Sequence, residues 1–86
     1  MGSARPKPER LAEKLLQIRL ALGLSQTEML KRLALDEDMK YARISEDEQG
    51  VREPSLLTLL EYSRVAGIHL EVLADDKLDL PTKLIR

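Results

Sequence analysis

The side chains best suited by type to metal or acid–base chemistry form two short acidic runs. They are Asp36-Glu37-Asp38 and Glu46-Asp47-Glu48. Carboxylate oxygens are ligands that hard cations such as Ca²⁺ prefer, but neither run has the residue spacing of a calcium-binding loop. We therefore expect no metal site in this protein.

Catalysis is not expected either. His69 is the only histidine, cysteine is absent, and no serine or aspartate stands at a recognisable triad spacing. A histidine at this position is ordinary for the start of a helix or the edge of a core. The sequence therefore predicts a protein that is not an enzyme and that uses no cofactor.

The composition predicts one small helical domain. A chain of 86 residues buries only about 60% of the surface that its unfolded form exposes. There is no Phe or Trp, and Tyr41 and Tyr62 are the only aromatic residues, so the core must be largely aliphatic, which suits helices packed on helices. No apolar run approaches the roughly 18 residues of a membrane span, and no signal peptide is evident. We expect a cytoplasmic protein.

The net charge of −1 is distributed unevenly along the chain. Residues 1–32 hold seven Lys and Arg against three acids (+4), residues 33–50 hold two against six (−4), and residues 51–86 hold five against six (−1). The basic part includes residues 1–8, an arm stiffened by Pro6 and Pro8. This arm is either a solvated tail or a contact to phosphate or to the minor groove.

Two segments with apolar periodicity and clear end signals predict the first two helices. The first runs from about Glu9 to Leu22 and ends at Gly23, which can adopt a left-handed conformation. The second, Gln26–Ala34, follows a capping box in which Ser25 and Glu28 each accept the other's backbone N–H. The inward positions of the first helix are Leu11, Leu15, Ile18 and Leu22, with Leu16 and Leu20 widening that face.

A third helix is predicted over Tyr41–Gln49 and ends at Gly50. The residues before it can form a separate single turn capped by Asp36, with Met39 folded back onto the core. The alternative is one uninterrupted helix over residues 37–49. The break is favoured because Met39 is out of phase with Ile44.

Two further helices complete the predicted domain of residues 9–74. Ser55 caps a helix over Leu56–Ala66, which Gly67 ends, and a short fifth helix covers His69–Ala74. Residues 75–86 form a C-terminal tail. The predicted buried residues are Leu15, Ile18, Leu30, Leu33, Ile44, Leu56, Leu59 and Leu60, with Ser63 also on the inward face of the fourth helix.

The predicted elements follow one another as a helix, a glycine turn, a capped helix, a further helix and a second glycine turn. This order is that of a helix-turn-helix nucleic-acid-binding domain. The same residues match the pattern Leu-x-Leu-Ser-Gln-x-x-Met, followed by Ile-Ser-x-x-Glu-x-Gly-x-x-x-Pro-Ser-Leu-x-x-Leu. This pattern resembles the family of lambda-type phage repressors and Cro (XRE-type regulators) over roughly residues 11–73. The matching positions are Leu22, Leu24, Ser25, Gln26, Met29, Ile44, Ser45, Glu48, Gly50, Pro54, Ser55, Leu56 and Leu59.

The resemblance implies an all-α, five-helix lambda-repressor-like fold and a sequence-specific DNA-binding transcriptional regulator. Its third helix would enter the major groove, where Arg can bind guanine and a carboxylate can accept from cytosine. The residues implied at base edges are Lys40, Tyr41, Arg43 and Glu46. Those implied at phosphates are Gln26, Lys31, Arg32 and Arg52. Each of these can instead be a solvated surface residue, Tyr41 can belong to the core, and Arg52 can pair with Glu48 or Glu53.

A domain this small contacts few base pairs alone, so the expected form is a homodimer on a palindromic site of double-stranded DNA. The candidate dimer contacts are Leu70, Leu73, Leu78 and Leu80.

The chain departs from the family pattern in two places. The link before the third helix is about four residues longer, and Asp47 stands where the family has an apolar residue. An unpaired buried carboxylate would cost several kcal/mol. Asp47 is therefore either turned to solvent or paired with a cation such as Arg43, Arg52 or a partner's side chain.

The acidic third helix also leaves a second function open, a protein-interaction module on the same scaffold, such as an antitoxin or adaptor. Fold alone does not decide between the two. A DNA-binding protein should present a basic rim around this helix.

Overall fold

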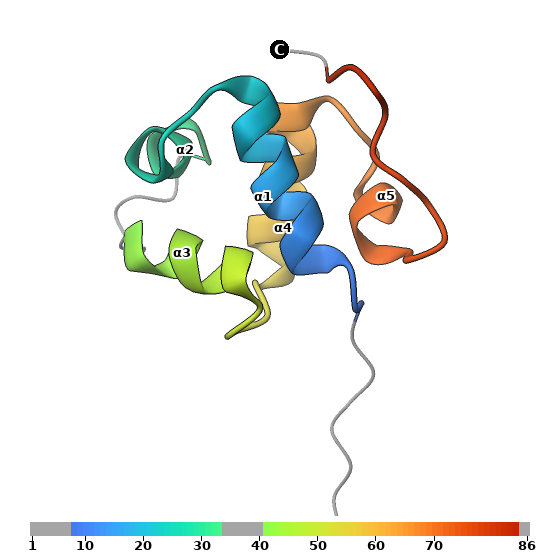
Figure 1. Cartoon of the computed structure of the whole chain (residues 1–86), viewed down its shortest axis with the longest axis horizontal. Coiled ribbons are helices and arrows are strands. Elements are labelled where there is room, and N and C mark those ends of the chain that lie inside the picture. The colour runs from blue at the N-terminus through green and yellow to red at the C-terminus, as the bar shows by residue number, and fades with distance from the viewer. Residues whose placement is uncertain (1–7, 34–40, 85–86) are drawn as a thin grey trace, which may run out of the picture.

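The computed structural model describes residues 8–33 and 41–84, and within them the chain forms five α-helices and no strand (Figure 1). The predicted all-α architecture is confirmed at this level. The helices are α1 (Leu11–Leu22), α2 (Gln26–Leu33), α3 (Tyr41–Gln49), α4 (Leu56–Ala66) and α5 (Leu70–Ala74). The two alternatives for the segment before α3, a capped turn or a longer helix, fall outside the described residues.

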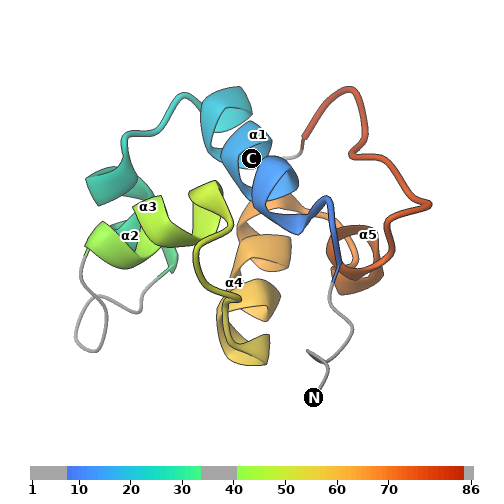
Figure 2. The same ribbon diagram turned by 60° about the horizontal axis from the view of Figure 1, so that its bottom comes forward.

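Helices α1 and α4 form the middle of the molecule. Helices α2 and α3 lie together on one side of this pair and α5 lies on the other (Figures 1 and 2). Helix α2 packs against α3 and α4, while α3 also packs against α1. The α2–α3 unit is therefore supported from behind by both central helices.

The helix ends follow the local signals in the sequence. The hydroxyl of Ser25 accepts the N–H of Glu28 at 3.0 Å, and the carboxylate of Glu28 accepts the N–H of Ser25 at 2.8 Å. Gly23 ends α1 with φ of 71°, a left-handed conformation that suits glycine. The hydroxyl of Ser55 accepts the N–H of Thr58 and begins α4 as predicted.

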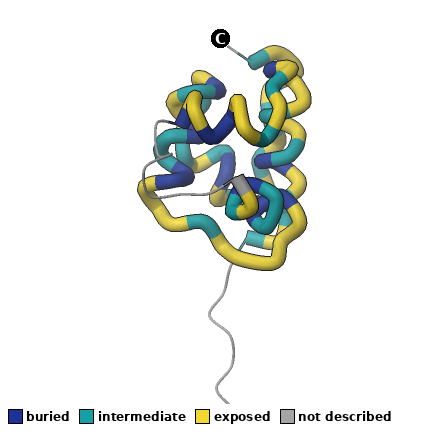
Figure 3. Tube along the Cα trace, turned by 90° about the vertical axis from the view of Figure 1, so that its left-hand side faces the viewer, coloured by how far each residue is buried: buried dark blue, intermediate teal, exposed yellow. Residues whose placement is uncertain are grey.

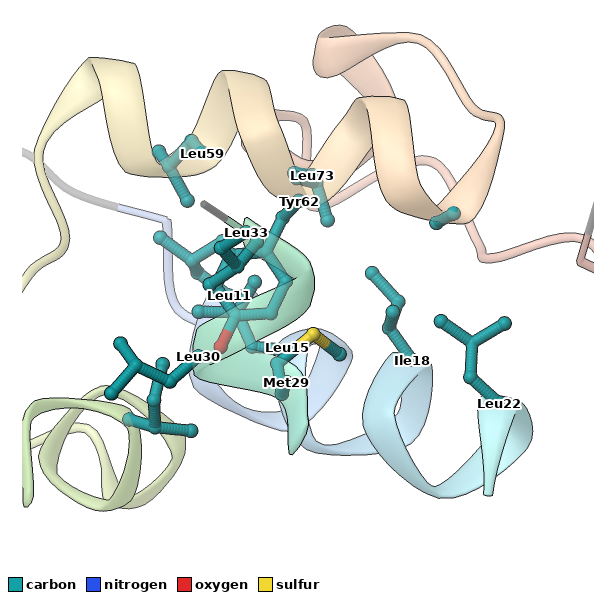
Figure 4. Close-up of a cluster of buried hydrophobic side chains, with 12 residues drawn as sticks. Leu11, Leu15, Ile18, Leu22, Met29, Leu30, Leu33, Leu59, Tyr62 and Leu73 are labelled. Atoms are coloured by element: carbon teal, nitrogen blue, oxygen red, sulfur yellow. The ribbon is translucent and has the colours of Figure 1, made fainter. Parts of the chain in front are cut away.

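The core gathers between α1, α2 and α4, and Figure 4 shows Tyr62 directed from α4 into it. Five of the eight predicted core residues are confirmed without change on α1, α2 and α3, and Leu59 on α4 is buried too. The prediction for Leu56 is wrong, since 67% of this residue is exposed, and Leu60 is only half-buried. Leu20, expected on the inner face of α1, is also exposed.

The reason for the error on α4 is the aromatic ring of Tyr62. This side chain is fully buried, and Thr58 and Ala66 lie one turn to either side of it on the same face. A helix that buries the largest side chain of this core must rotate Leu56 and Leu57 outward. Aliphatic spacing alone placed the inner face of α4 about one residue too late, since Thr58, Leu59 and Tyr62 are buried where the pattern put Leu59, Leu60 and Ser63.

Residues 76–79 lie against the start of α1. The carboxylate of Asp76 accepts the backbone N–H groups of Glu9 at 2.8 Å and Arg10 at 3.0 Å. These two bonds lower the pKa of Asp76. The guanidinium of Arg10 donates in return to the carbonyl oxygen of Asp76 at 2.8 Å and to the carboxylate of Asp79 at 2.7 Å.

Lys14 makes the most buried of these contacts. Its side chain is fully buried in α1, and its Nζ donates to the carbonyl oxygens of Val72 at 2.7 Å and Asp75 at 2.9 Å. The last carbonyl groups of a helix have no partner within the helix, and a cation near them is favoured by the helix dipole. Lys14 thus joins the end of α5 to α1.

Within the described residues, none of the helices is both long and apolar enough to cross a membrane.

Replacing Ser25 with Ala should destabilise the protein by about 1 kcal/mol, because the N–H of Glu28 loses its acceptor at the start of α2. Urea unfolding measures this loss. The matched control is Thr27→Ala, an exposed position in the same turn that caps nothing and should be neutral within about 0.5 kcal/mol. Equal stability of Ser25→Ala and wild type would show that the capping box contributes nothing.

Replacing Lys14 with Met should cost about 1–3 kcal/mol, since two partly buried carbonyl oxygens at the end of α5 lose their donor while the volume of the side chain stays similar. Lys77→Met is the control, because Lys77 is exposed in the following turn. Thermal unfolding of both variants gives the comparison. A Lys14→Met protein as stable as the control would mean that water replaces the ammonium at no cost.

Candidate nucleic-acid interface

An ion pair between Arg19 of α1 and Glu48 of α3 fixes the orientation of the α2–α3 unit. Arg19 Nε donates to Glu48 Oε2 at 2.6 Å, and Nη2 donates to Oε1 at 3.0 Å. The side chains are only 15% and 4% exposed, respectively. Their hydrogen bonds raise the pKa of the Arg19 guanidinium. A bidentate pair of this kind fixes both the distance and the rotation of the two helices.

The same pair reaches the turn before α2 and the first turn of that helix. Arg19 Nη1 donates to the carbonyl oxygen of Leu24 at 3.0 Å, and Gln26 Nε2 donates to Glu48 Oε1 at 3.3 Å. Gln26 is half-buried. Its amide has one further N–H and a carbonyl oxygen that these bonds do not use. The residue predicted at a phosphate is therefore held in place from behind by Glu48.

The sequence did not predict this pair. The sequence offers Arg52 as one possible partner of Glu48, four residues away, whereas the partner in the structure, Arg19, lies 29 residues earlier. The available signal was that Arg19 directly follows the buried Ile18, at the border of the apolar face of α1. An arginine there can keep its stem on the core and direct its head to a neighbouring helix.

The cations predicted at phosphates lie on the surface. Lys31 and Arg32 are exposed at the end of α2, and Arg52 is exposed in the turn after α3. On α3 itself, Arg43 and Glu46 are half-buried. Figure 3 looks onto this side of the molecule. Lys40 and the side chain of Tyr41 lie outside the described residues.

The acidic run on α3 is directed mainly inward. Glu48 is paired with Arg19, and Asp47 is only 2% exposed. Of the three acidic residues 46–48, Glu46 is half-buried and the other two are buried. The negative charge of the segment therefore contributes much less to the surface than its sequence suggests.

Asp47 shares the inner face of α3 with the fully buried Ile44. Among the described residues, its Oδ1 has no hydrogen-bond partner. Loss of hydration raises the pKa of Asp47 to about 6, against a smaller opposing effect of Arg52 and Arg43. Neither arginine forms an ion pair with it in the described part of the chain. The alternative in which Asp47 faces solvent is wrong.

The four leucines predicted at a dimer contact are placed mainly toward the core. Leu73 is fully buried and offers no surface to a second copy, so this prediction is wrong for Leu73. Leu70 and Leu80 pack partly against the core, and Leu78 is half-buried. A different set of apolar side chains, which the sequence did not predict at the surface, is exposed. Val51, Leu56 and Leu57 are 68%, 67% and 69% exposed.

Comparison of the chain with models of protein families, with curated proteins and with solved structures found no match.

Replacing Asp47 with Leu should stabilise the protein at pH 7 by about 1–3 kcal/mol, because it removes a desolvated carboxylate and adds apolar burial. The stability difference between Asp47→Leu and wild type should also depend on pH. The pKa of Asp47 in the folded protein, about 6, lies above the unfolded value near 3.9. Its contribution to stability is therefore lost as pH rises from 4 to 7, by roughly 2–3 kcal/mol.

Urea unfolding of wild type and Asp47→Leu at pH 4, 5.5 and 7 measures this difference, which should grow with pH. The neighbouring Glu46→Leu is the control and should change stability by less than about 0.5 kcal/mol at each pH. A destabilised Asp47→Leu protein would mean that the carboxylate has hydrogen-bond donors in solution.

Proposed function

We propose that this protein is a DNA-binding transcriptional regulator of the lambda-repressor-like helix-turn-helix type that works in the cytoplasm. Helices α2 and α3 would form the helix-turn-helix, with α3 in the major groove of double-stranded DNA. The order of the helices, the capping box before α2 and the turn at Gly50 support this assignment. DNA binding of this kind needs no cofactor and no catalytic group.

The observation that carries the proposal is the inward direction of the acidic side chains of α3. Glu48 is neutralised by Arg19, and Asp47 is buried. The exposed cations Lys31, Arg32 and Arg52 remain on the elements before and after α3. A basic rim of this kind is what phosphate binding requires, and it is the feature that separates a DNA-binding protein from an interaction module.

The residues take two roles in this proposal. The residues that would contact base edges are Lys40, directly before α3, and Tyr41, Arg43 and Glu46 within it. Gln26, Lys31, Arg32 and Arg52 would contact phosphates, and these set the register of the protein on the duplex. Gln26 suits this role because its bond to Glu48 orients the amide at the N-terminus of α2, where free N–H groups favour a phosphate.

We propose a homodimer as the working form, since one copy contacts few base pairs. The exposed side chains of Val51, Leu56 and Leu57 suit its interface better than the leucines of α5 and the tail, because they offer apolar surface that the core does not use. The same three residues favour the second candidate function. An interaction module would bind a partner protein through them.

The proposal predicts DNA binding that weakens steeply with salt. Four to six phosphate contacts give a slope of about −4 to −5 in a plot of log affinity against log salt concentration. Arg52→Ala should lower the magnitude of this slope by about one unit with little change in sequence preference. Fluorescence anisotropy with random duplex DNA across a salt series measures both.

Arg64→Ala is the matched control, because it removes an equal charge from an exposed position on α4 outside the proposed interface. It should leave the slope unchanged. Absence of binding at low salt would favour the interaction module, and an equal effect of both substitutions would remove Arg52 from the interface.

A further inference from the structure

A cavity of about 330 Å³ lies where the start of α1 meets the turn after α3. The two elements are in close contact there, since a Cβ built on Gly50 would lie 3.6 Å from the Cβ of Ala12 (Figures 1 and 2). Pockets for small molecules begin at about 300 Å³. This cavity is thus large enough for a small organic molecule.

Asp47 gives the cavity wall a polar group that lacks a partner. The residue is 98% buried, being only 2% exposed, and it lines the cavity. Its Oδ1 accepts no hydrogen bond from any described residue. A buried acceptor without a donor is costly, and a ligand that supplies the donor recovers this free energy on binding.

The charge of the wall favours a cation. Glu9 and Asp47 contribute carboxylates, and among the described residues that line the cavity Arg52 contributes the only cationic side chain. The rest of the wall includes the apolar side chains of Pro8, Leu11, Ala12 and Pro54. Apolar walls around one convergent charged group are typical of sites that bind a small amphipathic molecule.

We propose that this cavity binds a small organic cation, an alkyl chain that carries a guanidinium or ammonium group, with the charged group at the carboxylate of Asp47. The alkyl part lies against the prolines and Leu11. A guanidinium fits best, because its N–H groups match the geometry of a carboxylate. This binding does not depend on DNA, so it stands or falls separately from the proposed function.

The affinity should depend on pH through Asp47. With its pKa at about 6, this carboxyl is largely ionised at pH 7 and largely protonated at pH 5, so binding at pH 5 should be roughly ten-fold weaker. The charged and titratable groups around it are Arg43, Glu46 and Glu48 on its own helix, Arg52 in the next turn and Tyr62 on α4, with Glu9 and Glu53 at the cavity wall.

The test is a titration of the ¹⁵N-labelled full chain with n-butylguanidinium chloride at constant ionic strength, without DNA, followed by amide NMR shifts. The neutral probe n-butylurea has nearly the same shape and is the ligand control. We expect saturable shifts at Ala12, Gly50 and Arg52. The dissociation constant should be at least ten-fold lower for the guanidinium than for the urea, about the effect of one charge-assisted hydrogen bond.

Two variants decide the role of the carboxylate. Asp47→Asn should weaken butylguanidinium binding at least ten-fold, whereas Glu71→Gln, which removes an equal charge from an exposed position on α5 outside the cavity wall, should leave it unchanged. Equal binding of the two probes, or unchanged binding by Asp47→Asn, would overturn the proposal. If Asp47→Asn does not fold, the comparison of wild type at pH 5 and pH 7 decides, and equal affinity would overturn it.

Discussion

The bidentate pair between Arg19 and Glu48 is the constraint on which the rest of the candidate interface depends. Helix α3 has nine residues, and a helix this short is marginal without tertiary support. Among the described side chains of α3, Ile44 is the buried apolar one, and one apolar side chain does not fix the rotation of a helix. The two hydrogen bonds of the guanidinium do so, because they require one orientation of Glu48 relative to α1. We infer that this nearly buried pair contributes more to the geometry of α3 than to net stability.

The same rotation explains the position of Asp47. Successive residues of a helix are about 100° apart, so the orientation that brings Glu48 to Arg19 carries Asp47 toward the core beside Ile44. Glu48 finds a cation there, whereas Asp47 finds no donor among the described residues. Glu48 is thus paired within the fold, and its neighbour Asp47 lies at the wall of a cavity. Local conflicts of this kind are more often found at functional sites than elsewhere in a stable protein.

The sequence predicted those features that are encoded locally. All five helices begin and end within two residues of their predicted bounds, because Gly23, Ser25, Ser55 and Gly67 act on their immediate neighbours. The failures concern contacts that no local signal reports. Lys14 has partners 58 and 61 residues away, and the ring of Tyr62 sets the rotation of α4. For the candidate site, sequence identified the cations of α2 and the turn but could not pair Glu48 with Arg19.

The charge of a segment and the charge of its surface are therefore different quantities in this protein. Residues 33–50 carry a net charge of −4, which argues against a phosphate-rich partner if every side chain is assumed to be solvated. Glu48 is neutralised by a cation that the sequence places in another segment, and Asp47 lies behind the surface. The field outside the molecule depends on charges that remain solvated or unpaired. Lys31, Arg32 and Arg52 meet that condition by their exposure, so an acidic stretch on α3 is compatible with a basic rim around it.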